Sequence, residues 1–123
     1  MRYAIIKIEP ELAADLLAMG AAFDDALSTG NYQGEVFSFE TPGALFAAIT
    51  PKRWDVLNRL QGKQPMSIRE LAKQLGRDVK NVHTDAIKLL DIGLLERDDA
   101  GRIYSPFAEI KTEFTLRGEA QAA

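Results

Sequence analysis

The stretch that decides the fold runs from Ser67 to Arg102 and reads SIRELAKQLGRDVKNVHTDAIKLLDIGLLERDDAGR. Ser67 and Glu70 have the S-x-x-E spacing of a capping box, which predicts a helix over residues 68–75. The sequence Gly76-Arg77-Asp78 predicts a tight turn, because glycine readily ends a helix. A longer helix is then expected over residues 79–92, with its apolar side chains at helical spacing.

A β-hairpin is expected after the longer helix, which Gly93 ends. Residues 94–97 and 102–105 are predicted strands, joined by the turn Asp98-Asp99-Ala100-Gly101. Upstream, Thr50-Pro51 starts another helix that ends near Gly62. This order of helices and hairpin is that of a winged helix-turn-helix. The predicted fold class is therefore mainly α with small β (α+β), a winged helix-turn-helix domain with an N-terminal strand-helix-strand dimerisation arm.

The N-terminal arm is expected to contain strands over 2–8 and 35–40, a helix over 11–27 and a brief helix over 41–49. A further strand is predicted over 109–116. A lone amphipathic helix must bury its apolar stripe, so the arm is the predicted dimerisation element. The residues assigned to dimerisation are Ile5, Leu12, Leu16, Met19, Phe23 and Leu27.

Charge is distributed unevenly along the 123 residues, whose formal net charge is −3. Residues 1–50 hold two basic and seven acidic residues, whereas residues 51–102 hold eleven basic and eight acidic ones. A basic middle suits a nucleic-acid-binding half. The expected division is a dimerisation arm over 1–49, a DNA-binding domain over 50–117 and a flexible tail over 118–123.

Several classes of site and location are disfavoured by composition. The chain has no cysteine, which excludes disulfides and thiolate metal sites. His83 is the only histidine and has no acidic cluster at ligand spacing. Neither a catalytic triad nor a phosphate-binding glycine loop is found, so we expect no enzyme activity, metal or cofactor. Lys7 and Glu9 interrupt the opening residues and no long apolar run follows, which predicts a cytoplasmic protein without a membrane partner.

The longer helix is the expected recognition helix, whose N-terminal half would meet base edges in a major groove. Lysine, asparagine and threonine there suit phosphate or base contacts. Basic residues on the preceding helix and beside the hairpin suit phosphate contacts. The predicted DNA-binding residues are Ser67, Arg69, Lys73, Arg77, Lys80, Asn81, His83, Thr84, Lys88, Arg97 and Arg102.

Acidic residues in the same region oppose DNA binding. Asp85 lies on the predicted recognition helix, where it is expected to pair with Lys88 or to orient a neighbouring donor. Asp98-Asp99 at the hairpin tip would repel phosphate, which argues against deep insertion of the hairpin. Any single lysine or arginine here is also compatible with a solvated surface charge.

Four segments together resemble a prokaryotic family of MarR-like winged-helix regulators. They are TPKRWDVL, PMSIRELAKQLGRDVKNVHTD, LLDIGLLER and SPFAEI, within a match that covers residues 35–116. The resemblance implies operator binding as a dimer, with Lys80, Asn81, His83 and Thr84 at recognition positions, and some members look like antitoxins. The chain departs from the family at Thr84, where an arginine is expected, and at Phe107-Ala108.

Two functions therefore follow from the sequence. The first is a dimeric, DNA-binding transcriptional regulator, of the repressor class, that recognises a palindromic operator. The alternative is an antitoxin or interaction module whose winged helix serves mainly to bind a partner protein, such as a cognate toxin. The overall acidity and Asp85 favour the alternative.

Overall fold

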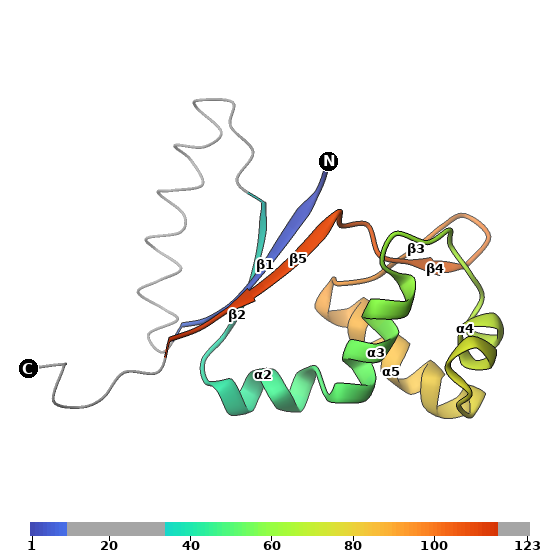
Figure 1. Ribbon diagram of the computed structural model, residues 1–123, viewed down its shortest axis with the longest axis horizontal. Helices are drawn as coiled ribbons and strands as arrows, with labels where there is room; N and C mark the ends of the chain where they lie inside the picture. Colours follow the sequence, from blue (N-terminus) through green and yellow to red (C-terminus); the bar gives the residue numbers. More distant parts are fainter. Residues whose placement is uncertain (10–33, 116–123) are drawn as a thin grey trace, which may run out of the picture. The chain divides into compact units, whose positions relative to one another are not determined.

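The computed structural model describes residues 1–9 and 34–115, which form two units (Figure 1). The helical unit comprises residues 1–2 and 46–108, and the sheet unit comprises the described residues 3–9, 34–45 and 109–115. The described residues contain four helices and two small sheets, so the α+β class predicted from the sequence is confirmed. In the chain, the helical unit lies between two strands of the sheet unit.

Three helices build most of the helical unit: α3 (Pro51–Leu60), α4 (Ile68–Leu75) and α5 (Val79–Ile92). Each packs on the other two. The helix starts are those that the sequence predicted, because each N-cap side chain accepts a backbone hydrogen bond. Thr50 accepts from Arg53 N at 3.3 Å, Ser67 from Glu70 N at 3.1 Å and Asp78 from Asn81 N at 3.3 Å.

The turn between α4 and α5 depends on Gly76, whose φ of 65° lies in the left-handed region. Its N–H bonds back to the last turn of α4, and Arg77 N donates to Ala72 O at 3.0 Å. Gly93, with a φ of 102°, ends α5 in the same way. The short connection thereby fixes where α5 begins relative to α4.

The core of the helical unit is formed by one face of each helix and by the chain after α5. The buried apolar residues of the three helices are Val56, Leu57, Leu60, Leu71, Ala72, Val82, Ala86 and Leu89. Leu94, Leu95 and Ile103 complete this core and have at most 1% exposure. Trp54, on α3, is half-buried.

The hairpin consists of β3 (Glu96–Arg97) and β4 (Ile103–Tyr104), which pair antiparallel. Both strands are shorter than predicted: Leu94 and Leu95 precede β3 as buried irregular chain, and β4 lacks Arg102 and Ser105. Met66, just before α4, joins Ile103 through two backbone hydrogen bonds of 3.0 and 2.9 Å. This bridge, which the sequence did not reveal, holds the start of α4 against the hairpin.

The sheet unit contains a three-stranded parallel sheet of order β2-β1-β5. Its strands are β1 (Tyr3–Ile8), β2 (Glu35–Phe39) and β5 (Glu109–Glu113), and α2 (Pro42–Ala48) follows β2 and continues into the helical unit. All three predicted strands are present. The sequence placed residues 109–117 with the DNA-binding domain, but β5 instead pairs with β1, where Tyr3 lies beside Glu109.

Of the predicted dimerisation residues, only Ile5 belongs to the described part of the chain, and it is half-buried on β1. Leu12, Leu16, Met19, Phe23 and Leu27 lie outside the described residues, as does the tail over 118–123. Among the helices that the structure describes, none is both long enough and apolar enough to cross a membrane.

Candidate nucleic-acid interface

One face of α5 is polar and open to solvent. Val82, Ala86 and Leu89 are fully buried, and they define the inner face of the helix. The five predicted recognition residues are all exposed on the rest of its surface: Lys80, Asn81, His83, Thr84 and Lys88. Thr84 Oγ1 donates to Lys80 O at 3.1 Å, which leaves the hydroxyl oxygen able to accept another bond.

Of the two acidic residues on α5, Asp91 is exposed near the C-terminal end, whereas Asp85 is withdrawn from this face. Its side chain is 12% exposed and pairs with two guanidinium groups. Arg53 Nε donates to Asp85 Oδ1 at 3.0 Å, and Arg77 Nη2 donates to Oδ2 at 2.7 Å. The expected pairing with Lys88 is wrong, because Asp85 lies on the buried side of the helix, where Arg53 and Arg77 approach it.

These three residues, here called the Asp85 clamp, join separate parts of the helical unit. Arg53 lies in the first turn of α3 and also donates from Nη1 to Ala48 O at 2.8 Å. Arg77 comes from the turn between α4 and α5. The clamp therefore ties α5 to the start of α3, to the end of α2 and to the turn before α5.

The electrostatics of the clamp keep Asp85 ionised. Burial by itself raises the pKa of this carboxyl group, since a low-dielectric environment disfavours charge. The hydrogen bonds from Arg77 and Arg53, together with their positive charges, outweigh burial and lower the pKa below its ordinary value. Asp85 thus stays negative at neutral pH and neutralises charge inside the protein rather than at its surface.

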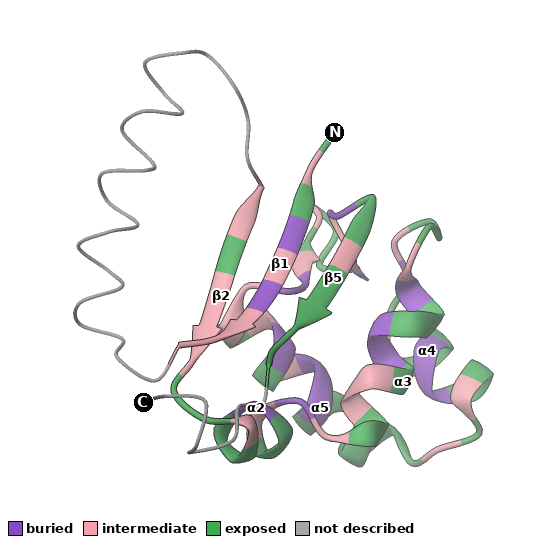
Figure 2. Ribbon diagram, turned by 60° about the vertical axis from the view of Figure 1, so that its left-hand side comes forward, coloured by how far each residue is buried: buried purple, intermediate pink, exposed green. Residues whose placement is uncertain are grey.

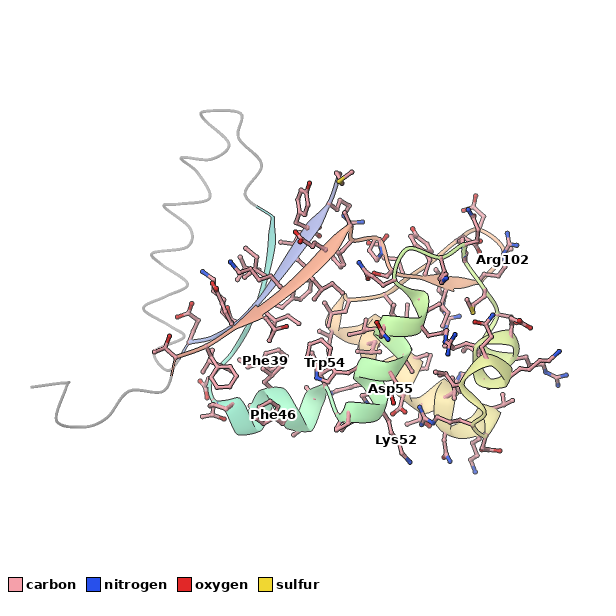
Figure 3. The ribbon with its side chains drawn as sticks, viewed as in Figure 1. Phe39, Phe46, Lys52, Trp54, Asp55 and Arg102 are labelled. Atoms are coloured by element: carbon pink, nitrogen blue, oxygen red, sulfur yellow. The ribbon has the colours of Figure 1, made fainter. Side chains whose placement is uncertain are left out.

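A shallow hollow of about 320 Å³ opens beside the clamp, where α3 and α5 begin. The clamp residues form part of its wall, and exposed polar side chains form the rest. Lys52 points outward from the start of α3 in Figure 3. The lining residues are Thr50, Lys52, Arg53, Arg77, Asn81, Thr84 and Asp85. The hollow combines one exposed ammonium group, two guanidinium groups and two neutral hydrogen-bonding side chains from α5.

The other predicted DNA-binding residues lie on α4 and the hairpin. Arg69 and Lys73 are exposed on α4. Ser67 is the N-cap of that helix, where its hydroxyl oxygen accepts a hydrogen bond from Glu70 N, so it stabilises the start of α4. Arg77 is mainly a positioning residue, because its side chain is 18% exposed and bonded to Asp85.

The hairpin tip carries a self-contained hydrogen-bond network. Asp98 accepts from Ala100 N at 3.0 Å and from Arg102 N at 2.9 Å, and it also pairs with Arg102 Nε at 3.0 Å. Arg97 Nη1 donates to Gly101 O at 3.3 Å. Arg102, labelled at the hairpin in Figure 3, is therefore ion-paired with Asp98. This pair partly neutralises the carboxylate and reduces the repulsion of phosphate expected from an acidic tip.

The sequence did not identify Thr50, Lys52 or Arg53 as part of this surface. These residues start α3, to which the sequence assigned no DNA-binding residue. Arg53 and Asp85 are 32 positions apart, so no local spacing links them. The available signal was a basic pair, Lys52-Arg53, in the first turn after an N-cap, because a helix start is a favourable place for an anion.

A family model described as HVO_A0114 matches residues 48–112, which is more than half of the chain. The chain belongs to the HVO_A0114 family. No curated protein and no solved structure matches it.

The part matched by the HVO_A0114 model runs from the end of α2 through the three helices and the hairpin into β5. It includes the Asp85 clamp, the exposed face of α5 and most of β5, whereas β1 and β2 lie outside it. Within the described residues, no group of three or more histidine, cysteine, aspartate or glutamate side chains is placed to hold a metal ion.

Proposed function

We propose that this HVO_A0114 family protein is a winged helix-turn-helix regulator of the MarR-like kind that its motifs resemble. In this proposal a dimer binds double-stranded DNA in the cytoplasm and represses transcription from a palindromic operator. The segment α5 would be the recognition helix, and the hairpin β3–β4 would be the wing. The bridge between Met66 and Ile103 supports this proposal, since it adds a third short strand segment to the hairpin.

The observation that carries the proposal is the charge of the exposed face of α5. Between Val79 and Leu90 the only acidic residue is Asp85, and it is buried and paired with two arginines. Lys80 and Lys88 are exposed on this stretch, and the exposed carboxylates of the N-cap Asp78 and of Asp91 lie only at its two ends. The face thus presents positive charge and hydrogen-bonding groups, which is what a major groove requires.

The hollow supplies a place for the DNA backbone in this proposal. Lys52, the exposed cation of the hollow, would receive a phosphate, while Asn81 and Thr84 on the same wall face the adjoining groove. Phosphate contacts position a protein on DNA, and base contacts specify sequence. One connected surface would then serve both tasks.

Charge reversal on α5 tests the proposal. We expect the double variant Lys80→Glu/Lys88→Glu to bind duplex DNA roughly 100-fold more weakly than the unmodified chain at about 0.1 M salt, since it exchanges two attractive charges for two repulsive ones. The matched control is Arg59→Glu/Lys63→Glu, which reverses two exposed charges at the opposite end of α3 from the hollow. The measurement is fluorescence anisotropy, first with duplexes of random sequence and then with selected sites.

Equal binding by the two double variants, or no binding of the unmodified chain at low ionic strength, would remove α5 as the DNA contact. The interaction-module alternative predicts instead that a partner protein is retained by the α5 variant. Asp85 no longer supports that alternative, because it is not available at the surface.

A further inference from the structure

The exposed edge of the parallel sheet is an unassigned surface. Strand β5 lies at one edge, and its only strand neighbour in the described sheet is β1. Four of its five residues are exposed, which Figure 2 shows as a largely green strand. At the opposite edge, β2 has only Val36 in the exposed class. An edge strand with exposed backbone groups is a template for pairing with another strand.

We propose that β5 pairs antiparallel with β5 of a second copy of this chain, with Thr112 facing Thr112 of that copy across a two-fold axis. The pairing would join two three-stranded sheets into one of six strands. This pairing rests on the dimer in the proposed function and specifies its interface. It does not require that the protein bind DNA. The second copy is favoured because the side chains of β5 complement themselves in this register.

The pairing with β1 shows which side chains of β5 share a face. Glu109, Lys111 and Glu113 lie beside Tyr3, Ile5 and Lys7, on one face. Ile110 and Thr112 lie beside Ala4 and Ile6 on the other, and both of those β1 residues are buried. Phe114 follows β5 and continues the alternation on the face of Ile110, with 45% exposure.

Only certain registers are open to a symmetric pair, because a two-fold axis perpendicular to the sheet places side chains of the same face opposite each other. Centring on Lys111 would oppose two lysines and would oppose Glu109 to Glu113 of the second copy twice. Directly opposed like charges destabilise a strand pair. Centring on Ile110 would pair only residues 109–111, because β5 begins at Glu109 and the chain bends at Ala108.

Centring on Thr112 gives complementary contacts at every pair from 110 to 114. Lys111 opposes Glu113 of the second copy, and Glu113 opposes Lys111 of the second copy. Ile110 opposes Phe114 of the second copy, also twice. Within one chain, Lys111 Nζ and Glu113 Oε2 are 3.5 Å apart with both side chains more than half exposed, so they are accessible to a second strand.

Site-specific cross-linking tests both the edge and its register. The chain has no cysteine, so a single Thr112→Cys substitution introduces the only thiol. Directly opposed residues of antiparallel strands have Cα atoms about 4.5–5.5 Å apart, within the range of a disulfide. We expect mild oxidation of T112C to give a covalent dimer. The control, Glu109→Cys, lies six positions out of register and is expected to cross-link at least 10-fold more slowly.

A charge swap supplies the second measurement, by sedimentation equilibrium without DNA. Lys111→Glu and Glu113→Lys are each expected to raise the Kd of the dimer at least 10-fold, because each creates two like-charge pairs. The double variant Lys111→Glu/Glu113→Lys restores opposite charges and is expected to return to within about 3-fold of the unmodified Kd. Circular dichroism checks that each variant is folded.

Three results would overturn the pairing: a monomer at about 100 µM, a dimer whose Kd none of these variants changes, and preferential cross-linking of Glu109→Cys. The second result would assign the dimer to another surface, such as the apolar stripe predicted over 11–27. None of these results bears on the α5 variants, whose DNA binding is measured separately, so failure of the interface and failure of the proposed DNA contact are distinguishable.

Discussion

At the scale of single residues, Asp85 changes how the surface of α5 is understood. In the sequence it is an acidic residue on a helix proposed to meet DNA. In the structure it accepts hydrogen bonds from Arg53 and Arg77, and both of its oxygens are used. A buried ion pair contributes little relative to apolar packing, but removal of one partner leaves charge uncompensated. Asp85 therefore stabilises the placement of α5 rather than contacting a ligand.

The first residue-scale prediction concerns pH. Asp85 has a lowered pKa in the folded state, so its stabilising effect is complete above the ordinary carboxyl value of about 3.9 and is lost as pH falls toward the lowered value. At neutral pH we expect Asp85→Asn to reduce the free energy of unfolding by about 3 kcal/mol. The deficit should shrink as pH falls below about 4.

Urea unfolding of both chains between neutral and acidic pH measures this deficit. The matched control is Asp55→Asn, which alters an exposed carboxylate on α3, labelled in Figure 3, and is expected to change stability little. A deficit for Asp85→Asn that is independent of pH would contradict the stabilising role of its ionised form.

At the scale of elements, local signals specified most of the helical unit. The caps at Thr50, Ser67 and Asp78 each depend on residues within three positions, so α3, α4 and α5 begin where the sequence predicted. The bridge of Met66 with Ile103 joins residues 37 positions apart and has no local pattern. The exposed recognition residues were predictable from helical spacing, but the contribution of Lys52 and Arg53 required the tertiary structure.

The element-scale prediction concerns the turn before α5. A Cβ at Gly76 meets nothing within 4 Å, so the cost of Gly76→Ala comes from its φ of 65° alone. We expect a loss of about 1–2 kcal/mol, the usual penalty for a side chain in the left-handed region. Gly43→Ala in α2 is the control, because its Cβ meets Thr41 Oγ1 at an ordinary 3.8 Å. Thermal unfolding measures the stability of both variants. An equal loss of stability in Gly76→Ala and Gly43→Ala would show that the left-handed conformation of Gly76 does not cause the loss.

At the scale of the whole molecule, the two proposals make one joint prediction about salt. If Lys52, Lys80 and Lys88 of both copies contact DNA, six contacts give a slope of about −5 for log K against log salt concentration. Lys88→Ala in both copies should make the slope shallower by roughly 2. At protein concentrations where the Lys111→Glu variant is monomeric, the slope should be half that of the unmodified dimer, because only one copy contacts the DNA.

Anisotropy titrations between about 0.05 and 0.3 M salt provide these slopes. An unchanged slope for Lys88→Ala would exclude that side chain from the contact. An unchanged slope for the dissociated Lys111→Glu variant would show that one copy suffices for binding.

The parallel pairing of β5 with β1 has a consequence for biosynthesis. Tyr3 and Glu109 are neighbours in the sheet although 106 positions separate them in the chain. During translation, β1 leaves the ribosome long before β5 is made, so one side of β1 waits for its strand partner while the helical unit is being synthesised. The helical contacts are more local and form faster than this pairing. A nascent chain stalled between the hairpin and β5 would therefore expose the edge of β1, and that species would be the one most in need of a chaperone.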